Sequence, residues 1–325
     1  PISYTYTVNP TPTVNAVSNQ TVCRGSNVAA VNFTGATTGT VYNWTNSNTA
    51  IGLAASGTGN IASFVGTNTT AAPISGTITV TPVYTNAGVT CTGTPRTFTI
   101  TVNPIPTVNA VANFAACHNT TAAAAFSGAT TGTVFNWTNS NPAIGLAASG
   151  TGDISFTAIN TTSAPVTATI TVTPTYTGAG FTCTGTATTF TITVNPTPSL
   201  TAVSNSIICN GSSNAITLTG PVTGSVYSWT NDNTAIGLAA SGTGNISFTA
   251  TNPGPDPITG TVSVTPSYTN AGLTCTGTAS TFTVTVNPSG QVNTVSNQVL
   301  CNGSTTSAVT FSTTNNGLIS TGGTQ

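Results

Sequence analysis

Apolar and polar residues alternate along much of this chain with a period of two. In the segment 97–102, Phe98, Ile100 and Val102 are separated by threonines, which places the three apolar side chains on one face of an extended strand. The segment 77–84 repeats the alternation, and no stretch shows a helical period with capping residues. The same criterion predicts further strands over residues 13–17, 28–33, 41–45 and 61–65.

A long internal repeat dominates the sequence. The block from Asn43 to Gly59 returns over residues 136–152 and 228–244. Each repeat holds roughly six or seven short predicted strands in about 92 residues, bounded by Gly, Asn or Pro, and this pattern is typical of a two-sheet antiparallel sandwich of immunoglobulin-like type. A parallel solenoid would need a much shorter repeat.

The repeat divides the chain into five parts. We predict an all-β protein, a tandem array of immunoglobulin-like antiparallel β-sandwich domains, with complete repeats over residues 10–103, 104–195 and 196–287. Residues 1–9 match the last strand of a preceding repeat, and residues 288–325 the truncated start of a fourth, divergent repeat, so we expect a piece of a longer array. Three repeats with strands of roughly seven to ten residues would form a rod of roughly 100–130 Å.

Each repeat contains one tryptophan: Trp44, Trp137 or Trp229. A tryptophan on the presumed third strand is typical of the core of such a sandwich, so we expect all three to be buried. The alternative is a stacking platform for sugar, which would require exposed side chains.

The seven cysteines occupy two positions in the repeat, and their regular spacing predicts disulfides and an oxidising, extracytoplasmic compartment. The first position holds Cys23, Cys117, Cys209 and Cys301, and the second holds Cys91, Cys183 and Cys275. We favour pairing within repeats, as Cys23–Cys91, Cys117–Cys183 and Cys209–Cys275, because it leaves one cysteine without a partner rather than three. If the two positions lie at opposite poles of the sandwich, pairing between repeats, as Cys23–Cys183 and Cys117–Cys275, replaces it.

An Asn-Pro-x-Pro motif marks each boundary between repeats. Two prolines one residue apart keep the backbone extended, so we predict rigid joints. The joint prolines are Pro10, Pro12, Pro104, Pro106, Pro196 and Pro198. The fourth boundary has Gly290 in place of the second proline, and we expect a looser joint there. Calcium is not expected at the joints, because Asp153, Asp232 and Asp256 do not cluster at the boundaries.

Charge is almost absent: the chain has two arginines, three aspartates and one histidine in 325 residues. So few charges cannot form a basic patch for nucleic acid. A catalytic triad would need an acidic residue near His118, and the spacing suggests none, so we expect no enzyme, no cofactor and no metal site. No apolar run approaches the roughly 20 residues of a membrane span, so no membrane insertion is expected in this fragment.

Rows of threonine on neighbouring strands form a further pattern. The rows at positions 77, 79 and 81 and at positions 97, 99 and 101 are predicted to lie side by side facing water, as in ice-binding surfaces. The simpler explanation is that threonine is both soluble and strand-favouring when charged residues are excluded.

Several motifs together resemble a known family. They are the Asn-Pro-x-Pro joint, Cys-x-Gly after the first strand, the Trp-Thr-Asn block, Ala-Ile-Gly-Leu-Ala-Ala-Ser-Gly-Thr-Gly, and Cys-Thr-Gly-Thr before the last strand. The combination resembles PKD-like, immunoglobulin-type repeats of large Bacteroidota cell-surface adhesins, similar to gliding-motility adhesins, and covers nearly the whole chain. The resemblance implies type IX secretion and a rigid extracellular stalk or filament.

Two other functions stay open from the sequence: an array of glycan-binding modules, and spacer repeats of a large secreted hydrolase. The expected partners are other repeats of the same protein, surface polysaccharide, or laterally associated copies of the chain, because edges of nearly uncharged sheets can pair. Nucleic acid is not an expected partner.

Overall fold

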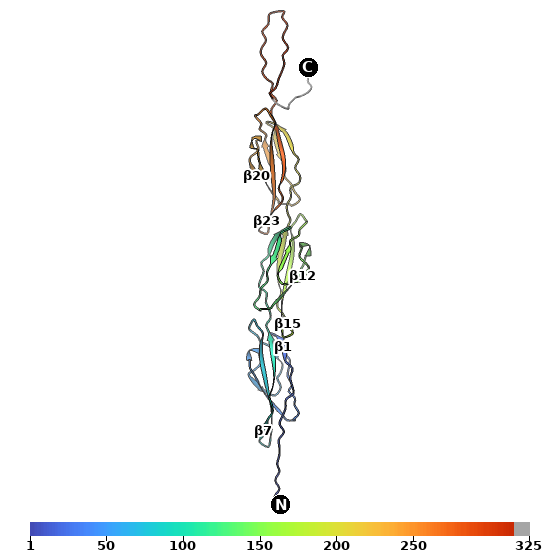
Figure 1. The fold of residues 1–325 in the computed structure, drawn as a ribbon, viewed down its shortest axis with the longest axis vertical. Coiled ribbons are helices and arrows are strands. Elements are labelled where there is room, and N and C mark those ends of the chain that lie inside the picture. The colour runs from blue at the N-terminus through green and yellow to red at the C-terminus, as the bar shows by residue number, and fades with distance from the viewer. Residues whose placement is uncertain (315–325) are drawn as a thin grey trace.

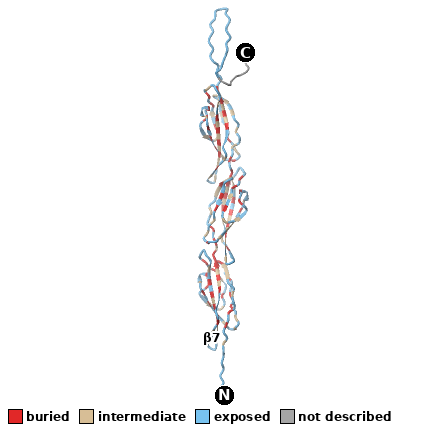
Figure 2. Ribbon diagram, in the orientation of Figure 1, coloured by how far each residue is buried: buried red, intermediate tan, exposed pale blue. Residues whose placement is uncertain are grey.

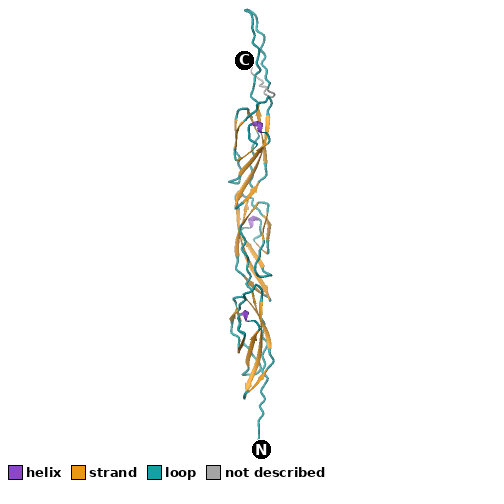
Figure 3. Ribbon diagram, turned by 90° about the vertical axis from the view of Figure 1, so that its left-hand side faces the viewer, coloured by secondary structure: helices purple, strands orange, loops and turns teal. Residues whose placement is uncertain are grey.

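The strands predicted from the alternation assemble into three similar bodies arranged in a line (Figure 1). The computed structural model describes residues 1–314. We call the bodies unit 1 (β1–β8), unit 2 (β9–β16) and unit 3 (β17–β24). Residues 1–9 extend from one end of the row and residues 288–314 from the other, so the molecule is long and narrow (Figures 1 and 3).

The strand bounds recur from unit to unit. Unit 1 contains β1 (Gln20–Cys23), β2 (Asn27–Val28), β3 (Val41–Asn46), β4 (Ser56–Thr58), β5 (Phe64–Val65), β6 (Ile74–Asn86), β7 (Val89–Thr92) and β8 (Arg96–Asn103). Unit 2 contains β9 (Phe114–Cys117), β10 (Thr121–Ala124), β11 (Val134–Asn139), β12 (Ser149–Thr151), β13 (Ile154–Thr157), β14 (Val166–Gly178), β15 (Phe181–Thr184) and β16 (Thr188–Asn195). Unit 3 contains β17 (Ser206–Cys209), β18 (Ser213–Ile216), β19 (Val226–Asn231), β20 (Ser241–Thr243), β21 (Ile246–Thr249), β22 (Ile258–Asn270), β23 (Leu273–Thr276) and β24 (Ser280–Asn287).

Each unit is a sandwich of one large and one small sheet. In unit 1 the large sheet has the order β1-β8-β6-β3-β4, with β7 paired to β6, and the small sheet is β2-β5. Most pairs are antiparallel, but β1 runs parallel to β8, with Cys23 opposite Asn103 at their ends. The parallel pair recurs as β16·β9 and β17·β24. One short 3₁₀ helix per unit follows the third strand of the unit (β3, β11 or β19): Thr49–Ile51, Pro142–Ile144 and Thr234–Ile236 (Figure 3).

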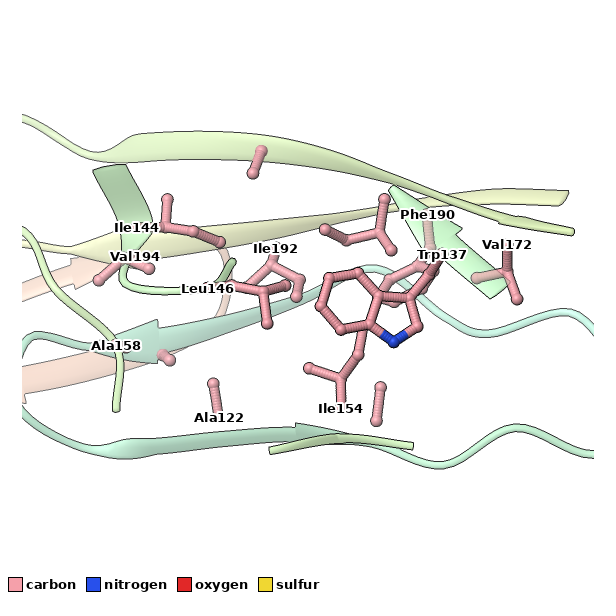
Figure 4. Close-up of a cluster of buried hydrophobic side chains, with 14 of the residues drawn as sticks. Ala122, Trp137, Ile144, Leu146, Ile154, Ala158, Val172, Phe190, Ile192 and Val194 are labelled. Atoms are coloured by element: carbon pink, nitrogen blue, oxygen red, sulfur yellow. The ribbon is translucent and has the colours of Figure 1, made fainter. Parts of the chain in front are cut away.

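The alternating apolar residues meet between the two sheets of each unit, where the buried positions are concentrated (Figure 2). In unit 2, Trp137 packs with Phe190, Ile192 and Ile154 in one continuous core (Figure 4). The threonine rows lie on the opposite face of the large sheet, where Thr77 pairs with Thr99 and Thr79 with Thr97. The strict alternation therefore decides which face of the sheet is dry.

Three details differ from the strand prediction. The predicted strands over residues 28–33 and 61–65 shorten to β2 and β5, which pair over two residues, with one further bridge between Val31 and Ile61. Residues 13–17 do not form a strand, although Val14 is buried in the core of unit 1. The first strand is instead Gln20–Cys23, which lies at the sheet edge and pairs only with β8. A short polar edge strand of this kind lacks the alternation on which the prediction depended, because only its pairing makes it a strand.

Residues 288–314 contain no strand, yet they repeat the contacts made at the start of unit 1. Asn293 donates its backbone N–H to Ser312 at 2.8 Å, as Asn15 does to Thr34. Gln298 bonds Ser307 through its side chain, repeating a contact of Gln20. Residues 293–312 thus repeat the local contacts of residues 15–34.

Candidate functional site: the joints between units

The disulfides cross the joints. Cys23 is bonded to Cys183 and Cys117 to Cys275, with Cα atoms 5.6 Å apart in both pairs. The favoured pairing within repeats is therefore wrong, and the alternative pairing between repeats is correct. Among the described residues Cys91, Cys209 and Cys301 are free thiols.

This pairing follows from the end, or pole, of the sandwich at which each cysteine lies. Because β1 runs parallel to β8, Cys23 lies beside the last residue of β8, at the pole of unit 1 that faces unit 2. Cys91 pairs with Tyr84 in the β6–β7 hairpin, which lies at the far pole (Figure 1). The two thiols of one unit are thus separated by the length of the sandwich, beyond the reach of a disulfide. Cys183 in β15 lies next to β1 instead (Figure 1).

A buried asparagine closes each joint. Asn103, the last residue of β8, is fully buried and donates from Nδ2 to the carbonyl oxygens of Gly178 at 2.8 Å and Phe181 at 3.2 Å. Asn195 makes the same contacts with the β22–β23 hairpin at 3.0 and 3.5 Å. Asn9, which is only partly buried, makes the same contacts with the β6–β7 hairpin at 3.1 and 3.2 Å. The last strand of one unit therefore holds the cysteine hairpin of the next.

The joint between units 1 and 2 lacks one bond that its equivalents have. Asn270 donates back from Nδ2 to Oδ1 of Asn195 at 2.9 Å, and Asn86 forms the same bond with the asparagine before unit 1 at 3.0 Å. Unit 2 has Gly178 at this position. Oδ1 of Asn103 is consequently buried with no hydrogen-bond partner in the described part of the chain.

The second proline of each joint packs closely on a glycine. A Cβ atom on Gly185 would collide with the carbonyl oxygen of Pro106. The equivalent pairs in the other units are Pro12 with Gly93 and Pro198 with Gly277. This contact explains the glycine of the Cys-Thr-Gly-Thr motif. Of the predicted joint prolines, Pro12, Pro104, Pro106, Pro196 and Pro198 are buried and Pro10 is exposed.

His118 has a structural role at the same pole. Its backbone N–H donates to the carbonyl oxygen of Asn195 at 3.0 Å, which ties β9 to the end of β16. Its Nδ1 accepts the backbone N–H of Asn160 at 3.0 Å, and Asn210 accepts from Asn252 at 2.9 Å in the same way. In units 2 and 3 this position supplies an acceptor, through His118 and Asn210, whereas unit 1 has Arg24 there, which cannot accept.

The tryptophans lie in the cores, with exposed fractions of 7%, 7% and 8% for Trp44, Trp137 and Trp229. A Cβ atom on Gly150 would overlap the indole of Trp137, and the equivalent glycines lie against the other two rings. Packing therefore requires at least these glycines of the repeated block.

The charged residues serve as single acceptors or lie in solvent. Asp153 accepts the backbone N–H of Phe126 at 2.8 Å, and Asp232 accepts that of Thr261 at 2.6 Å. Residues 1–314 contain no group of three or more His, Cys, Asp or Glu side chains that could hold a metal ion. No helix in this range is long and apolar enough to cross a membrane.

The asparagines of the joints are the residues that the sequence interpretation missed. The signal was present, since Asn9, Asn103 and Asn195 each precede the first proline of a joint. Local propensity explains only the prolines of the motif, because a side chain that bonds a hairpin about 75 residues later leaves no trace in it.

Comparison with known proteins identifies related domains. The family model of the PKD-like domain matches residues 115–198 and 206–290, more than half of the chain. No curated protein sequence matches. The structure of Sidekick-1 immunoglobulin domains 1–5 aligns at 12% identity and a TM-score of 0.33, over 86% of this chain and 61% of that one. Mouse Protocadherin-24 EC1-3 aligns at 14% identity and a TM-score of 0.32, over 88% of this chain and 99% of that one.

The human Desmocollin-1 ectodomain aligns at 13% identity and a TM-score of 0.29, over 87% of this chain and 63% of that one. This chain thus spans less than two thirds of the Sidekick-1 and Desmocollin-1 structures.

Proposed function

Since this chain belongs to the PKD-like domain family, we propose that its units form a rigid, non-enzymatic stalk or filament segment of a large extracellular adhesin. The observation that carries the proposal is that both disulfides join neighbouring units. A disulfide within a sandwich would stabilise only that sandwich. A disulfide across a joint, together with a buried asparagine and two prolines, limits bending between units.

The proposal also covers the cellular location of the protein. Disulfides form and persist in oxidising compartments, which supports a place outside the cytoplasm. The motif resemblance supports a Bacteroidota surface protein exported by the type IX route and similar to gliding-motility adhesins. On this view the repeat units span residues 10–103, 104–195 and 196–287, between a strand of a preceding unit and the start of a fourth.

The two alternative functions receive less support. A glycan-binding array that stacks sugar on tryptophan would need exposed rings, and all three rings are buried. Spacer repeats of a secreted hydrolase would have the same joints, and the complete reading frame would distinguish a hydrolase from an adhesin.

Small-angle scattering of two matched variants tests the stalk. One variant replaces Cys91, Cys209 and Cys301 by serine and keeps both disulfides, whereas the other replaces all seven cysteines. We expect the first to scatter as a straight rod, with three units occupying roughly 100–130 Å. The second should show a broader distribution of bending. A compact or freely bending envelope for the first variant would refute the proposal.

A further inference from the structure

Three segments of equal length, 91–117, 183–209 and 275–301, each run from a cysteine to a cysteine across a joint. In the segment 183–209, the chain leaves the β14–β15 hairpin, follows β16 across unit 2, passes the Asn-Pro motif and ends at the far pole of unit 3 in β17. Each segment is therefore the covalent route from the near pole of one unit to the far pole of the next.

The disulfides join these segments end to end. Cys23 is bonded to Cys183, so residues 1–23 continue into 183–209, a route that we call line A. Cys117 is bonded to Cys275, so residues 91–117 continue into 275–301, which we call line B. The residues between the two cysteines of each unit, 24–90, 118–182 and 210–274, belong to neither line.

Both lines are nearly extended. Unit 2 is crossed by line B over residues 104–117 and by line A over residues 183–195, about 13 residues each, or about 43 Å at 3.3 Å per residue. The longest strand of the unit, β14, also has 13 residues, so each line spans about the length of the sheet with little slack. The covalent path along each line is therefore only slightly longer than the folded unit that it crosses.

From this connectivity we infer that tension along the rod is carried by two covalent lines, and that the rod does not lengthen one unit at a time. This inference deepens the proposed stalk and rests on it. Tension applied to the two ends of the chain pulls line A at residue 1 and line B beyond residue 301. Force passes between the lines within the units, through β1·β8, β16·β9 and β17·β24, which are each paired over four residues.

These three strand pairs act in parallel, so any one of them can transmit the load between line A and line B. If unit 1 unfolds, residues 24–103 become slack, but Cys23 still passes the load to Cys183 and the rod does not lengthen. If unit 3 unfolds, the load still crosses unit 2 to Cys117 and continues at Cys275. The rod lengthens only when all three connections have failed. A simple tandem array without these disulfides would instead lengthen by one unit at each failure.

The same geometry assigns a role to the free thiols. Cys91 lies at the start of line B and Cys209 at the end of line A, each in the position that its bonded equivalents occupy at a joint. In an array with a further unit after unit 3, Cys209 is placed to bond the hairpin cysteine of that unit. The observed bonds have sequence separations of 160 and 158 residues, and the new bond would have a similar one.

Single-molecule pulling between the two ends of the full chain tests the inference. With the disulfides intact, the shortest covalent route uses residues 1–23, 117–183 and 275–325, about 140 residues, or about 500 Å at 3.5 Å per residue. We expect one lengthening event, at a force above that of the disulfide-free chain, to a contour of about 500 Å. The seven-serine variant should lengthen in three events of about 92 residues each, to a contour of about 1,100 Å.

The variant with only Cys91, Cys209 and Cys301 replaced is the matched control, because it keeps both disulfides and should pull like the parent chain. Circular dichroism of the seven-serine variant verifies that its units are folded before pulling. With the disulfides intact, lengthening toward about 500 Å in several separate events, or at the force of the disulfide-free chain, would overturn the inference. The proposed stalk would still stand after that result if scattering shows a straight rod. A bent or compact scattering envelope would instead refute the stalk proposal.

Discussion

The side-chain oxygen Oδ1 of Asn103, which is buried without a hydrogen-bond partner in the described part of the chain, allows a specific test of how the joint is stabilised. Replacing Gly178 by asparagine should give Oδ1 of Asn103 the donor that it lacks. Asn86 and Asn270 already supply that donor to the equivalent oxygens, at 3.0 and 2.9 Å. The substitution therefore copies into unit 2 a bond that the neighbouring units form.

Three contributions determine the expected change in the free energy of unfolding. A net hydrogen bond to a buried acceptor contributes about 1 kcal/mol. Gly178 has no positive φ, so a side chain is compatible with its backbone, and the lost freedom of the unfolded chain contributes about 0.5 kcal/mol. Against this, a Cβ atom would lie 2.7 Å from Oδ1 of Asn103 and 2.8 Å from Cε1 of Tyr176, so both side chains must shift. We expect a net stabilisation of about 1 kcal/mol.

Thermal unfolding and hydrogen exchange measure the effect. If units 1 and 2 melt together, 1 kcal/mol corresponds to a rise in Tm of about 3 °C. The amides of the hairpin at residues 177–181 should exchange more slowly, because the hairpin is held by one more bond. Gly178→Ala is the control, since it restricts the unfolded chain equally but offers no donor. If Gly178→Asn melts no higher than Gly178→Ala, the bond is not formed and the reasoning fails.

Three further outcomes are expected. His118→Ala should lower the free energy of unfolding by about 1 kcal/mol, because the backbone N–H of Asn160 loses its acceptor. His118→Asn should leave it nearly unchanged, because Asn210 accepts the equivalent bond in unit 3. Equal losses for the two variants in urea melts would contradict this. Gly185→Ala should cost about 2 kcal/mol by displacing the Pro106 carbonyl, and an unchanged Tm would exclude that contact. Reduction of either disulfide, which closes a loop of 160 or 158 residues, should lower the free energy of unfolding by about 5 kcal/mol, and coincident melting curves with and without reductant would argue against it.

Most of the sandwich follows from local pattern. Strict alternation identified β8 and much of β6, and the same pattern placed their threonines on the wet face. The recurrence of one tryptophan per repeat indicated the core position that all three rings occupy. These features are local because strand faces have a period of two and each repeat carries its own core.

The edge strand was harder to find. Gln20–Cys23 has no apolar alternation, and its strand conformation comes from parallel pairing with residues about 80 positions later. The predicted strand over residues 13–17 contributes Val14 to the core but forms no ladder in the structure. Pairing partners at such a distance are set by the assembled sheet and not by the intrinsic preference of the segment.

The sequence by itself determined the repeat, the sandwich class, the near absence of charge and the presence of two cysteine positions in each unit. It left two pairings consistent with that period, because a regular spacing is unchanged when every bond is moved by one unit. Only the tertiary structure decided between them. The parallel run of β1 beside β8 places Cys23 at one pole and the β6–β7 hairpin places Cys91 at the other, so a short covalent bond can reach only the next unit.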